Sequence, residues 1–448
     1  MLSRKELEAK AAKPSEEALR LHPFYRGKVQ TMPRCRIRDV DDFAIWYSPG
    51  VAAACMDIAA HPEKVYEHTS KWNTIAVVTN GTRVLGLGNI GPEAGLPVME
   101  GKCLLYKYLG GVDAVPICLD TRDADEFIRT VKLIQPAFGG VNLEDIEQPK
   151  CFYILDTLKA EMSIPVWHDD QQGTATVTLA GLINALKVVG KRMGEVRTAM
   201  IGSGAANVAI IRMLVAAGVD PKRMVVVDSN GILHRGRKDL EATKDQYKDK
   251  WHLCNTTNAE GRTGGIAEAM KGADVCIALS RSGPGVIQKE WVASMSKDAI
   301  VFPCANPVPE IWPWDAKEAG ARVIATGRSD FPNQVNNSMG FPAIFRGALD
   351  VGAKAITDEM CIAAAYELAA CAEDAGLHEE NIIPTMAEVE PFIREAVAVG
   401  LKAQEQGVAT MKVSREELRK KAETMIKEAR RAVEVLQREN IIPEAPEE

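Results

Sequence analysis

The chain has 448 residues, and its 54 Lys and Arg against 61 Asp and Glu give a net charge of -7 at pH 7. Its composition of 46% apolar and 26% charged residues is typical of a soluble globular protein, and the length indicates two packed domains. The negative charge would repel a nucleic-acid backbone, so no nucleic-acid partner is expected.

The cysteines and the N-terminal segment indicate a cytoplasmic protein. Ten cysteines are scattered from Cys35 to Cys371 without a C-x-x-C pair, which is typical of reduced thiols rather than disulfides or a zinc site. Residues 1–20 carry charges of both signs and lack the apolar stretch of a signal peptide. We find no run long and apolar enough to span a bilayer, so no membrane partner is expected.

Local patterns in the first third of the chain predict an α/β domain. Ser3 with Glu6 forms a capping-box pattern, which predicts a short helix before an irregular segment that continues through Arg38. Residues 75–165 then alternate strand-like and helical runs, so a mainly parallel sheet is expected in a first domain at 1–165. The expected strands are Ile75–Thr79, Ala114–Leu119 and Ile164–Trp167, and the expected helices include Asp123–Ile134 and Pro149–Met162.

A second strand series begins after the helical run Thr174–Val189. It predicts a Rossmann-like, doubly wound domain at residues 166–350. The expected strands are Arg197–Ile201, Met224–Val227, Asp274–Leu279, Ala299–Phe302 and Arg322–Ala325. The fold class is therefore α/β with two domains, followed by C-terminal helices.

Residues 351–448 are expected to be helical throughout. Ser414 with Glu417 predicts the cap of a long charged helix that ends near Asn440. An apolar stripe along this helix needs a cover, which the first domain or a partner subunit would supply. The stripe consists of Leu418, Ala422, Ile426, Ala429, Val433 and Leu436.

The expected strand that ends at Ile201 leads through a Gly-x-Gly turn into an apolar helix. Such glycines allow a tight turn and a close approach to a pyrophosphate, whose charge the helix N-terminus stabilises. Asp228 closes the next strand, where a carboxylate would bind a ribose 2′-hydroxyl. A Gly-rich turn without a ligand is the alternative. The expected cofactor-binding residues are Gly202, Ser203, Gly204, Ala205, Ala206, Asn207, Asp228 and Asn306.

One departure from the fingerprint and one group of nearby charges qualify the dinucleotide prediction. Asn207 replaces the third glycine of the common fingerprint, so the helix and strand are expected to pack less closely. Asp228 favours NAD because its carboxylate would repel a 2′-phosphate. Arg235, Arg237 and Lys238 follow closely, however, and keep NADP a candidate.

Two acidic pairs end strand-like runs in the first half of the chain. These are Glu144-Asp145 and Asp169-Asp170, each placed before a helical stretch. Carboxylates without His or Cys partners favour Mg²⁺ or Mn²⁺ over zinc, whereas helix capping is the alternative role. His168 precedes the second pair and is expected to be a packed, hydrogen-bonded residue rather than a metal ligand.

Seven motif-like segments follow one another between about Val40 and Ala370. They are Tyr47-Ser-Pro-Gly-Val-Ala52, Gly86-Leu-Gly-Asn-Ile-Gly91, Val98-Met-Glu-Gly-Lys102, Gly139-Gly-Val-Asn-Leu-Glu-Asp145, His168-Asp-Asp-Gln-Gln-Gly-Thr174, Ala305-Asn-Pro-Val-Pro-Glu310 and Gly327-Arg-Ser-Asp-Phe-Pro-Asn-Gln-Val-Asn-Asn337. With them the sequence resembles the malic enzymes, particularly the compact bacterial and archaeal kind. The resemblance implies oxidative decarboxylation of L-malate to pyruvate and CO₂ with reduction of NAD or NADP. It also implies oxaloacetate decarboxylation, a need for Mg²⁺ or Mn²⁺, and a homodimer.

The resemblance assigns roles to individual residues. A metal ion would lower the pKa of the substrate hydroxyl, and a lysine beside that ion would have its own pKa lowered and act as the base. The implied set has Glu144, Asp145 and Asp170 as metal ligands, Lys102 as the base supported by Asp169, Tyr47 as the acid that protonates the enol, and Arg83, Asn306, Asn336 and Asn337 as substrate-binding groups.

The sequence departs from the family pattern at several positions and leaves other functions open. Gln172 stands where histidine is usual, Asn80 replaces a common aspartate, and Ser203 and Asn207 alter the glycine loop. A malolactic enzyme that converts malate to lactate with bound NAD would use the same residues. A non-catalytic dinucleotide sensor would not need Tyr47 and Lys102, and an amino-acid dehydrogenase would not need a carboxylate metal cluster.

Overall fold

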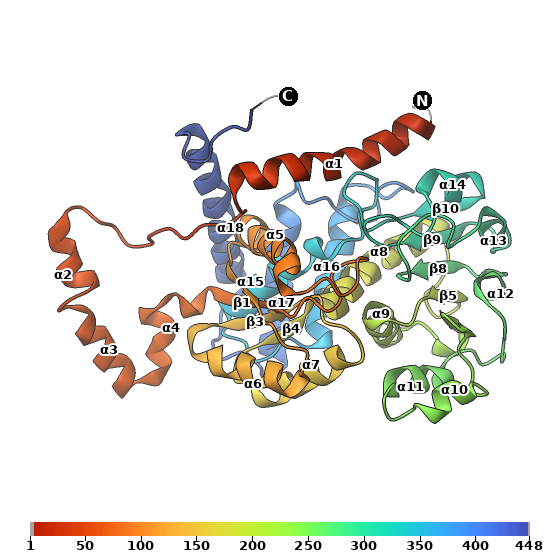
Figure 1. Ribbon diagram of the computed structural model, residues 1–448, viewed down its shortest axis with the longest axis horizontal. Coiled ribbons are helices and arrows are strands. Elements are labelled where there is room, and N and C mark those ends of the chain that lie inside the picture. Colours follow the sequence, from red (N-terminus) through yellow and green to blue (C-terminus); the bar gives the residue numbers. More distant parts are fainter. Residues whose placement is uncertain (1–3, 447–448) are drawn as a thin grey trace.

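The computed structural model describes residues 4–446, in which two sheets lie side by side among helices (Figure 1). The first sheet has four parallel strands in the order β2-β1-β3-β4. Ile75 and Val77 pack toward α5, whereas Ala76 and Val78 pack toward α6 and α7, so both faces of the sheet are covered. The strands are β1 (Thr74–Thr79), β2 (Asp113–Cys118), β3 (Gly140–Leu143) and β4 (Val166–His168).

The second sheet has six strands in the order β10-β9-β8-β5-β6-β7, and it is parallel except for β7. Met200 of β5 packs into the core that α8 and α9 share, and Ala199 packs into a second core on the opposite face. This doubly wound arrangement confirms the predicted fold class. The strands are β5 (Thr198–Ile201), β6 (Met224–Asp228), β7 (Gly231–Ile232), β8 (Val275–Ala278), β9 (Ala299–Pro303) and β10 (Ala321–Ile324).

Helices pack around both sheets, and one element lies across the expected domain boundary. β4 pairs with β3 and belongs to the first sheet, although it follows residue 165. The α-helices are α1 (Arg4–Tyr25), α2 (Phe43–Trp46), α3 (Val51–Ala60), α4 (Val65–His68), α5 (Pro92–Gly110), α6 (Ala124–Ile134), α7 (Lys150–Glu161), α8 (Thr174–Val189), α9 (Ala205–Ala216), α10 (Lys238–Ala242), α11 (Lys248–Thr256), α12 (Ile266–Met270), α13 (Lys289–Ala293), α14 (Pro313–Glu318), α15 (Phe341–Asp350), α16 (Asp358–Asp374), α17 (Glu390–Glu405) and α18 (Arg415–Arg438).

The C-terminal helices pack back on the first domain. Ser414 caps α18 and forms the predicted capping box with Glu417. α18 contacts α5, α15 and α17 of the same chain, and these contacts bury Leu418, Ala422 and Ile426. The predicted apolar stripe is therefore covered largely within the chain, and it gives no indication of a partner subunit.

The N-terminal segment forms a helix and then a projecting arm. α1 has 22 residues and is longer than the short helix expected, whereas Ser3 of the predicted capping box lies outside the described residues. Residues 40–68, which we call the arm, carry α2, α3 and α4 and extend away from the body (Figure 1).

The arm contains an apolar stretch that the sequence analysis did not single out. Within the described residues, Val40–Ala60 is the stretch that meets the length and hydropathy of a membrane span, contrary to our expectation. It is not one continuous helix, because a turn that contains Pro49 separates α2 from α3.

Candidate active site

The two acidic pairs meet at the carboxyl edge of the first sheet. Leu143 of β3 pairs with His168 of β4, so the residues that follow these strands lie beside each other. The backbone N–H of Asp145 donates to Asp170 Oδ2 at 2.8 Å. Glu144, Asp145 and Asp170 each place a carboxylate oxygen within 4.8 Å of the other two. The fold thus brings the three predicted metal ligands together at one point.

Burial makes this cluster unfavourable without a cation. Burial raises the pKa of Asp145 to about 8, and it raises the pKa of Glu144 well above its usual value. The pKa values of Asp169 and Asp170 are also raised by loss of solvation, which Lys102 partly opposes. Asp145 Oδ2 is buried without a hydrogen-bond partner in the described part of the chain. These carboxylates fit a hard divalent cation, which would satisfy the free oxygen and offset their repulsion.

Lys102 projects from α5 against the same acids. Its ammonium donates a hydrogen bond to Asp169 and lies 3.2 Å from Glu144 Oε1. It also lies 4.4 Å from the ring centre of Phe341. Burial lowers the pKa of Lys102, but Asp169 and Glu144 outweigh that effect and raise it. The acids thus favour the charged form of Lys102, and the lowered pKa that we expect for Lys102 beside a metal ion stays a prediction.

Local packing fixes the positions of Lys102 and Asp169. Tyr106, one helical turn after Lys102, packs on Phe341 and donates to Asn142 Oδ1 at 2.9 Å. A side chain at Gly173 would collide with Asp169 Oδ1, so only glycine fits beside that carboxylate. Neighbouring elements thus hold the ion pair in place.

His168 and Gln172 lie behind the acids. His168 is fully buried as expected, but neither ring nitrogen has a hydrogen-bond partner among residues 4–446, so that part of the prediction is wrong. Burial lowers its pKa to about 3, which makes the ring neutral. Gln172, which departs from the family pattern, accepts a hydrogen bond from the His168 backbone at 3.2 Å.

A cavity of about 1010 Å³ joins this cluster to the second sheet. Lys28 and Ser280, which the sequence analysis missed, also line it. Ser280 follows β8 at the carboxyl edge of its sheet, a position that signals ligand contact, whereas Lys28 has no such signal. The predicted site residues along its wall are Arg83, Lys102, Glu144, Asp170, Gly204, Ala205, Ala206, Asn306, Asn336 and Asn337.

Tyr47 is the predicted catalytic residue that lies elsewhere. It follows α2 on the arm, its side chain is 74% exposed, and it does not line the cavity. The structure therefore does not bring Tyr47 and Lys102 together within one chain.

The dinucleotide loop has the expected backbone geometry. Gly202 has φ +106°, and a Cβ there would lie 2.5 Å from the Leu279 carbonyl oxygen, so glycine is required. Gly204 precedes α9 as its N-cap. Asn207 donates to the carbonyls of Ile201 and Gly202, each at 2.9 Å, and so ties α9 to the end of β5. The residue that replaces the third glycine thus forms a bridge between helix and strand.

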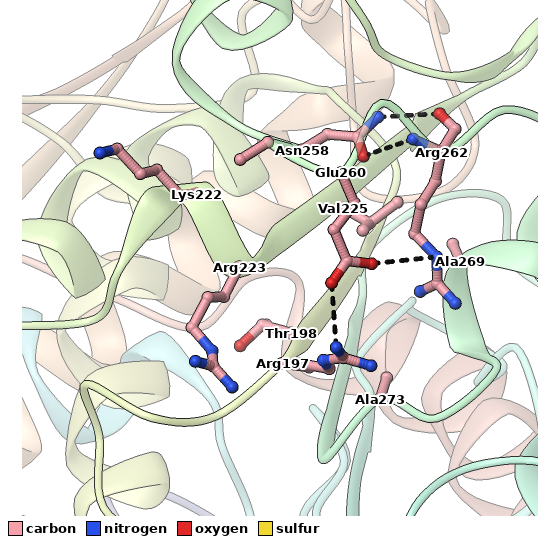
Figure 2. A pocket seen from close by; sticks show the side chains of 11 residues that line it. Arg197, Thr198, Lys222, Arg223, Val225, Asn258, Glu260, Arg262, Ala269 and Ala273 are labelled. Carbon is pink, nitrogen blue, oxygen red and sulfur yellow. Dashed lines mark hydrogen bonds and ion pairs between the residues drawn. The ribbon is translucent and has the colours of Figure 1, made fainter.

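A smaller cavity of about 180 Å³ lies at the amino ends of β5 and β6 (Figure 2). Figure 2 shows Glu260 between Arg197 and Arg262, with its carboxylate 2.9 Å from Arg197 Nη2. Ligands of open α/β sheets bind at the opposite, carboxyl ends of the strands. We therefore take the larger cavity as the candidate active site.

Family comparisons agree with this geometry. The family described as malic enzyme, N-terminal domain, matches residues 26–159, and the malic enzyme, NAD binding domain, matches residues 171–404. The chain belongs to the malic enzyme family. It is an NAD(P)-dependent enzyme, and both predictions are confirmed.

Similar proteins support the same conclusion. A bifunctional malic/malolactic enzyme of Bacillus subtilis is 49% identical over 409 residues, which cover 91% of this chain and 97% of that relative. An NADP-dependent malic enzyme of Escherichia coli is 43% identical over 89% of this chain and 53% of its own length. The crystal structure of the Entamoeba histolytica malic enzyme has a TM-score of 0.96 at 48% identity, and covers 100% of this chain and 93% of that one.

Proposed function

We propose that this malic enzyme oxidises and decarboxylates L-malate to pyruvate and CO₂, reduces NAD or NADP, and also decarboxylates oxaloacetate. The observation that carries the proposal is Lys102, held between Asp169 and Glu144 at a cavity that also reaches the dinucleotide loop. A proton acceptor, a carboxylate cluster and a dinucleotide loop at one cavity are the groups that this reaction needs.

The side chains of the chain divide the work. Lys102 Nζ, in its neutral amine form, accepts the proton of the substrate hydroxyl, and its hydrogen bond to Asp169 holds it in place. Arg83, Asn306, Asn336 and Asn337, which share the cavity wall, orient the two substrate carboxylates. A divalent cation, Mg²⁺ or Mn²⁺, held by Glu144, Asp145 and Asp170 supplies Lewis-acid chemistry when bound.

The second sheet positions the coenzyme. Gly202, Ser203, Gly204, Ala205, Ala206 and Asn207 form the loop and first turn that receive the pyrophosphate, with Asp228 near the adenine ribose and Asn306 at the cavity. The bound dinucleotide supplies the hydride acceptor.

Turnover assays test the reaction. Purified protein is given L-malate with NAD or with NADP, in Mn²⁺ or in EDTA, while pyruvate and lactate are assayed. Metal-dependent reduction with stoichiometric pyruvate is expected. Coenzyme binding without any turnover would contradict the proposal and favour a sensor.

A malolactic activity is the second candidate, and the bifunctional Bacillus subtilis relative favours it. Lactate formed without net coenzyme reduction is the product that distinguishes it. The same assay separates the two reactions, because pyruvate and lactate are measured together.

We propose that the enzyme is a homodimer in which Tyr47 enters the partner's cavity. One observation is the apolar surface of the arm, which no other part of the described chain covers. The exposed apolar residues between 40 and 60 are Val40, Phe43, Ile45, Trp46, Val51 and Met56.

A matching surface surrounds the cavity. Leu85 and Leu104 line the cavity itself, and both are exposed. The exposed apolar residues around them are Leu87, Ile90 and Leu96. Contact between arm and rim would remove both apolar surfaces from water and bring the Tyr47 hydroxyl to the enol.

Mixed dimers test this arrangement. Tyr47→Phe and Lys102→Ala proteins, each inactive alone, are mixed, dissociated and reassociated. If Tyr47 acts in the partner, each heterodimer has one intact site, and random pairing restores about one quarter of the wild-type rate. If Tyr47 acts within its own chain, no heterodimer contains an intact site and no activity returns.

We also propose a cytoplasmic location. All ten cysteines lie within residues 4–446 as free thiols, and eight of them are at least partly buried, which suits a reducing compartment. An increase in the number of reactive thiols when the protein is denatured would support this location. A disulfide in protein isolated under thiol-blocking conditions would contradict it.

A further inference from the structure

The end of β6 carries a charged group of three residues, Asp228, Arg237 and Asp239, which we call the Asp–Arg–Asp trio. Arg237 Nη1 and Nη2 donate to the two carboxylate oxygens of Asp228, each at 3.0 Å. From the other side, Arg237 Nε donates to Asp239 Oδ1 at 2.7 Å and Nη2 donates to Asp239 Oδ2 at 2.6 Å. The guanidinium is thus held by two bidentate contacts.

These contacts leave Arg237 without a free donor. A guanidinium has five N–H groups, and four of them serve the two carboxylates. The fifth points from Nη1 to the Gly231 carbonyl oxygen at 3.4 Å. The Arg237 side chain is only 9% exposed, so its orientation is fixed. The hydrogen bonds that Arg237 donates to Asp239 and to Asp228 raise the pKa of Arg237, so the cation is permanent.

The three members differ in their access to solvent. Asp228 is 7% exposed and Asp239 is 48% exposed. Asp239 therefore occupies the Nε side of the guanidinium from the surface, where an incoming phosphate would otherwise form a bidentate contact. The trio carries one net negative charge, which disfavours a phosphate, whereas Asp228 retains lone pairs that can accept a hydrogen bond from a ribose hydroxyl.

We propose that Asp239 is a specificity-determining residue, which holds Arg237 on Asp228 and thereby favours NAD over NADP. The inference rests on the proposed dinucleotide site, with the ribose 2′-position at Asp228. Asp239 acts through Arg237 and is a positioning residue. Arg235 and Lys238, the other nearby cations, are exposed, and Arg235 donates to the Asn255 carbonyl.

Coenzyme binding without malate tests the proposal. NADH and NADPH are titrated into wild type and Asp239→Asn, and the coenzyme fluorescence gives each Kd. The substitution removes one charge and releases two Arg237 donors. NADPH is expected to bind about tenfold more tightly, because the released Arg237 donors form charge-assisted hydrogen bonds to its 2′-phosphate in place of those to Asp239. The Kd of NADH is expected to change less than about twofold.

Two further variants give the result its meaning. Glu241→Gln changes the charge of the same exposed helix by the same amount, so equal tightening there would overturn the proposal. Adding Arg237→Gln to Asp239→Asn should abolish the gain, and a retained gain would also overturn it. If the folded wild type binds neither NADH nor NADPH, that result would instead contradict the dinucleotide site itself.

Discussion

The acid cluster and the arm contrast in what each leaves without a partner. The cluster buries charge, since Asp145 has a buried carboxylate oxygen with no hydrogen bond in residues 4–446. The arm exposes apolar surface, with Trp46 49% exposed and Tyr47 74% exposed. Both features oppose the usual preferences of a folded chain. The kind of violation indicates the kind of partner: buried charge requires a small ion, and exposed apolar side chains require a protein surface.

Replacing Lys102 should have the largest effect, because it removes the cation that pairs with Asp169 and Glu144. For Lys102→Ala we expect kcat to fall by about 10²–10⁴, the range for a lost general base, with the Kd of NADH unchanged. Lys107→Ala on the same helix is the control, since Lys107 pairs with Asp113 at the surface. Near-normal turnover of Lys102→Ala would contradict the assigned role.

Replacing Asp145 should separate binding from stability. Burial raises the pKa of Asp145 to about 8, which opposes folding above the unfolded pKa of about 3.9, and Asp145→Asn removes this cost, so its Tm in EDTA at pH 7 should exceed that of wild type. Its affinity for Mn²⁺ should fall by more than about 100-fold, since loss of a ligand exceeds loss of a supporting group. Thermal unfolding in EDTA and in Mn²⁺ measures both effects. A variant that Mn²⁺ stabilises as strongly as wild type would place the ion elsewhere.

The sequence predicts the acid cluster better than the arm because the cluster follows from local rules. Glu144 and Asp170 end adjacent parallel strands, and parallel strands end at one edge of a sheet. The position of Tyr47 depends on a second surface that the local pattern does not contain.

The sequence also could not predict how side chains pair or where very short strands form. The sequence indicates Arg237 as a cation that keeps NADP a candidate, but in the structure its guanidinium donates to two acids, Asp228 and Asp239. β4 has three residues, so hydrogen bonds to β3 rather than a long pattern decide the sheet to which it belongs. Two-residue β7 and its antiparallel pairing were not predicted for the same reason.

Charging the arm should weaken the dimer while the body stays folded. Met56 on the arm and Leu133 on α6 are each 69% exposed, which makes them a matched pair. Burial of a methionine side chain contributes about 1.5–3 kcal/mol, and the dimer buries two copies of Met56, so Met56→Glu should raise the dimer Kd by at least about 100-fold. Sedimentation velocity across a dilution series measures the change. An equal effect of Leu133→Glu would remove the arm from the interface.

Glu395 tests whether every buried, unpaired acid signals a ligand. It lies on α17, and neither of its carboxylate oxygens has a hydrogen-bond partner in the described chain. Unlike the acid cluster, it does not line the cavity. Burial alone raises its pKa well above the usual value. We therefore expect Glu395 to be a neutral acid in the folded protein rather than part of a metal site.

The pH dependence of unfolding distinguishes the two kinds of acid. Because the folded pKa of Glu395 is raised, its contribution is fully present below the unfolded pKa of about 4.3 and is lost as pH rises toward the folded pKa. The loss reaches about 1.4 kcal/mol per pH unit, and Glu395→Gln should remove it. Urea unfolding between pH 5 and 8, with the surface variant Glu434→Gln as control, measures this slope. Mn²⁺ should leave the Glu395→Gln difference unchanged, because no ion binds there, whereas a difference that disappears in Mn²⁺ would make Glu395 part of the metal-linked network.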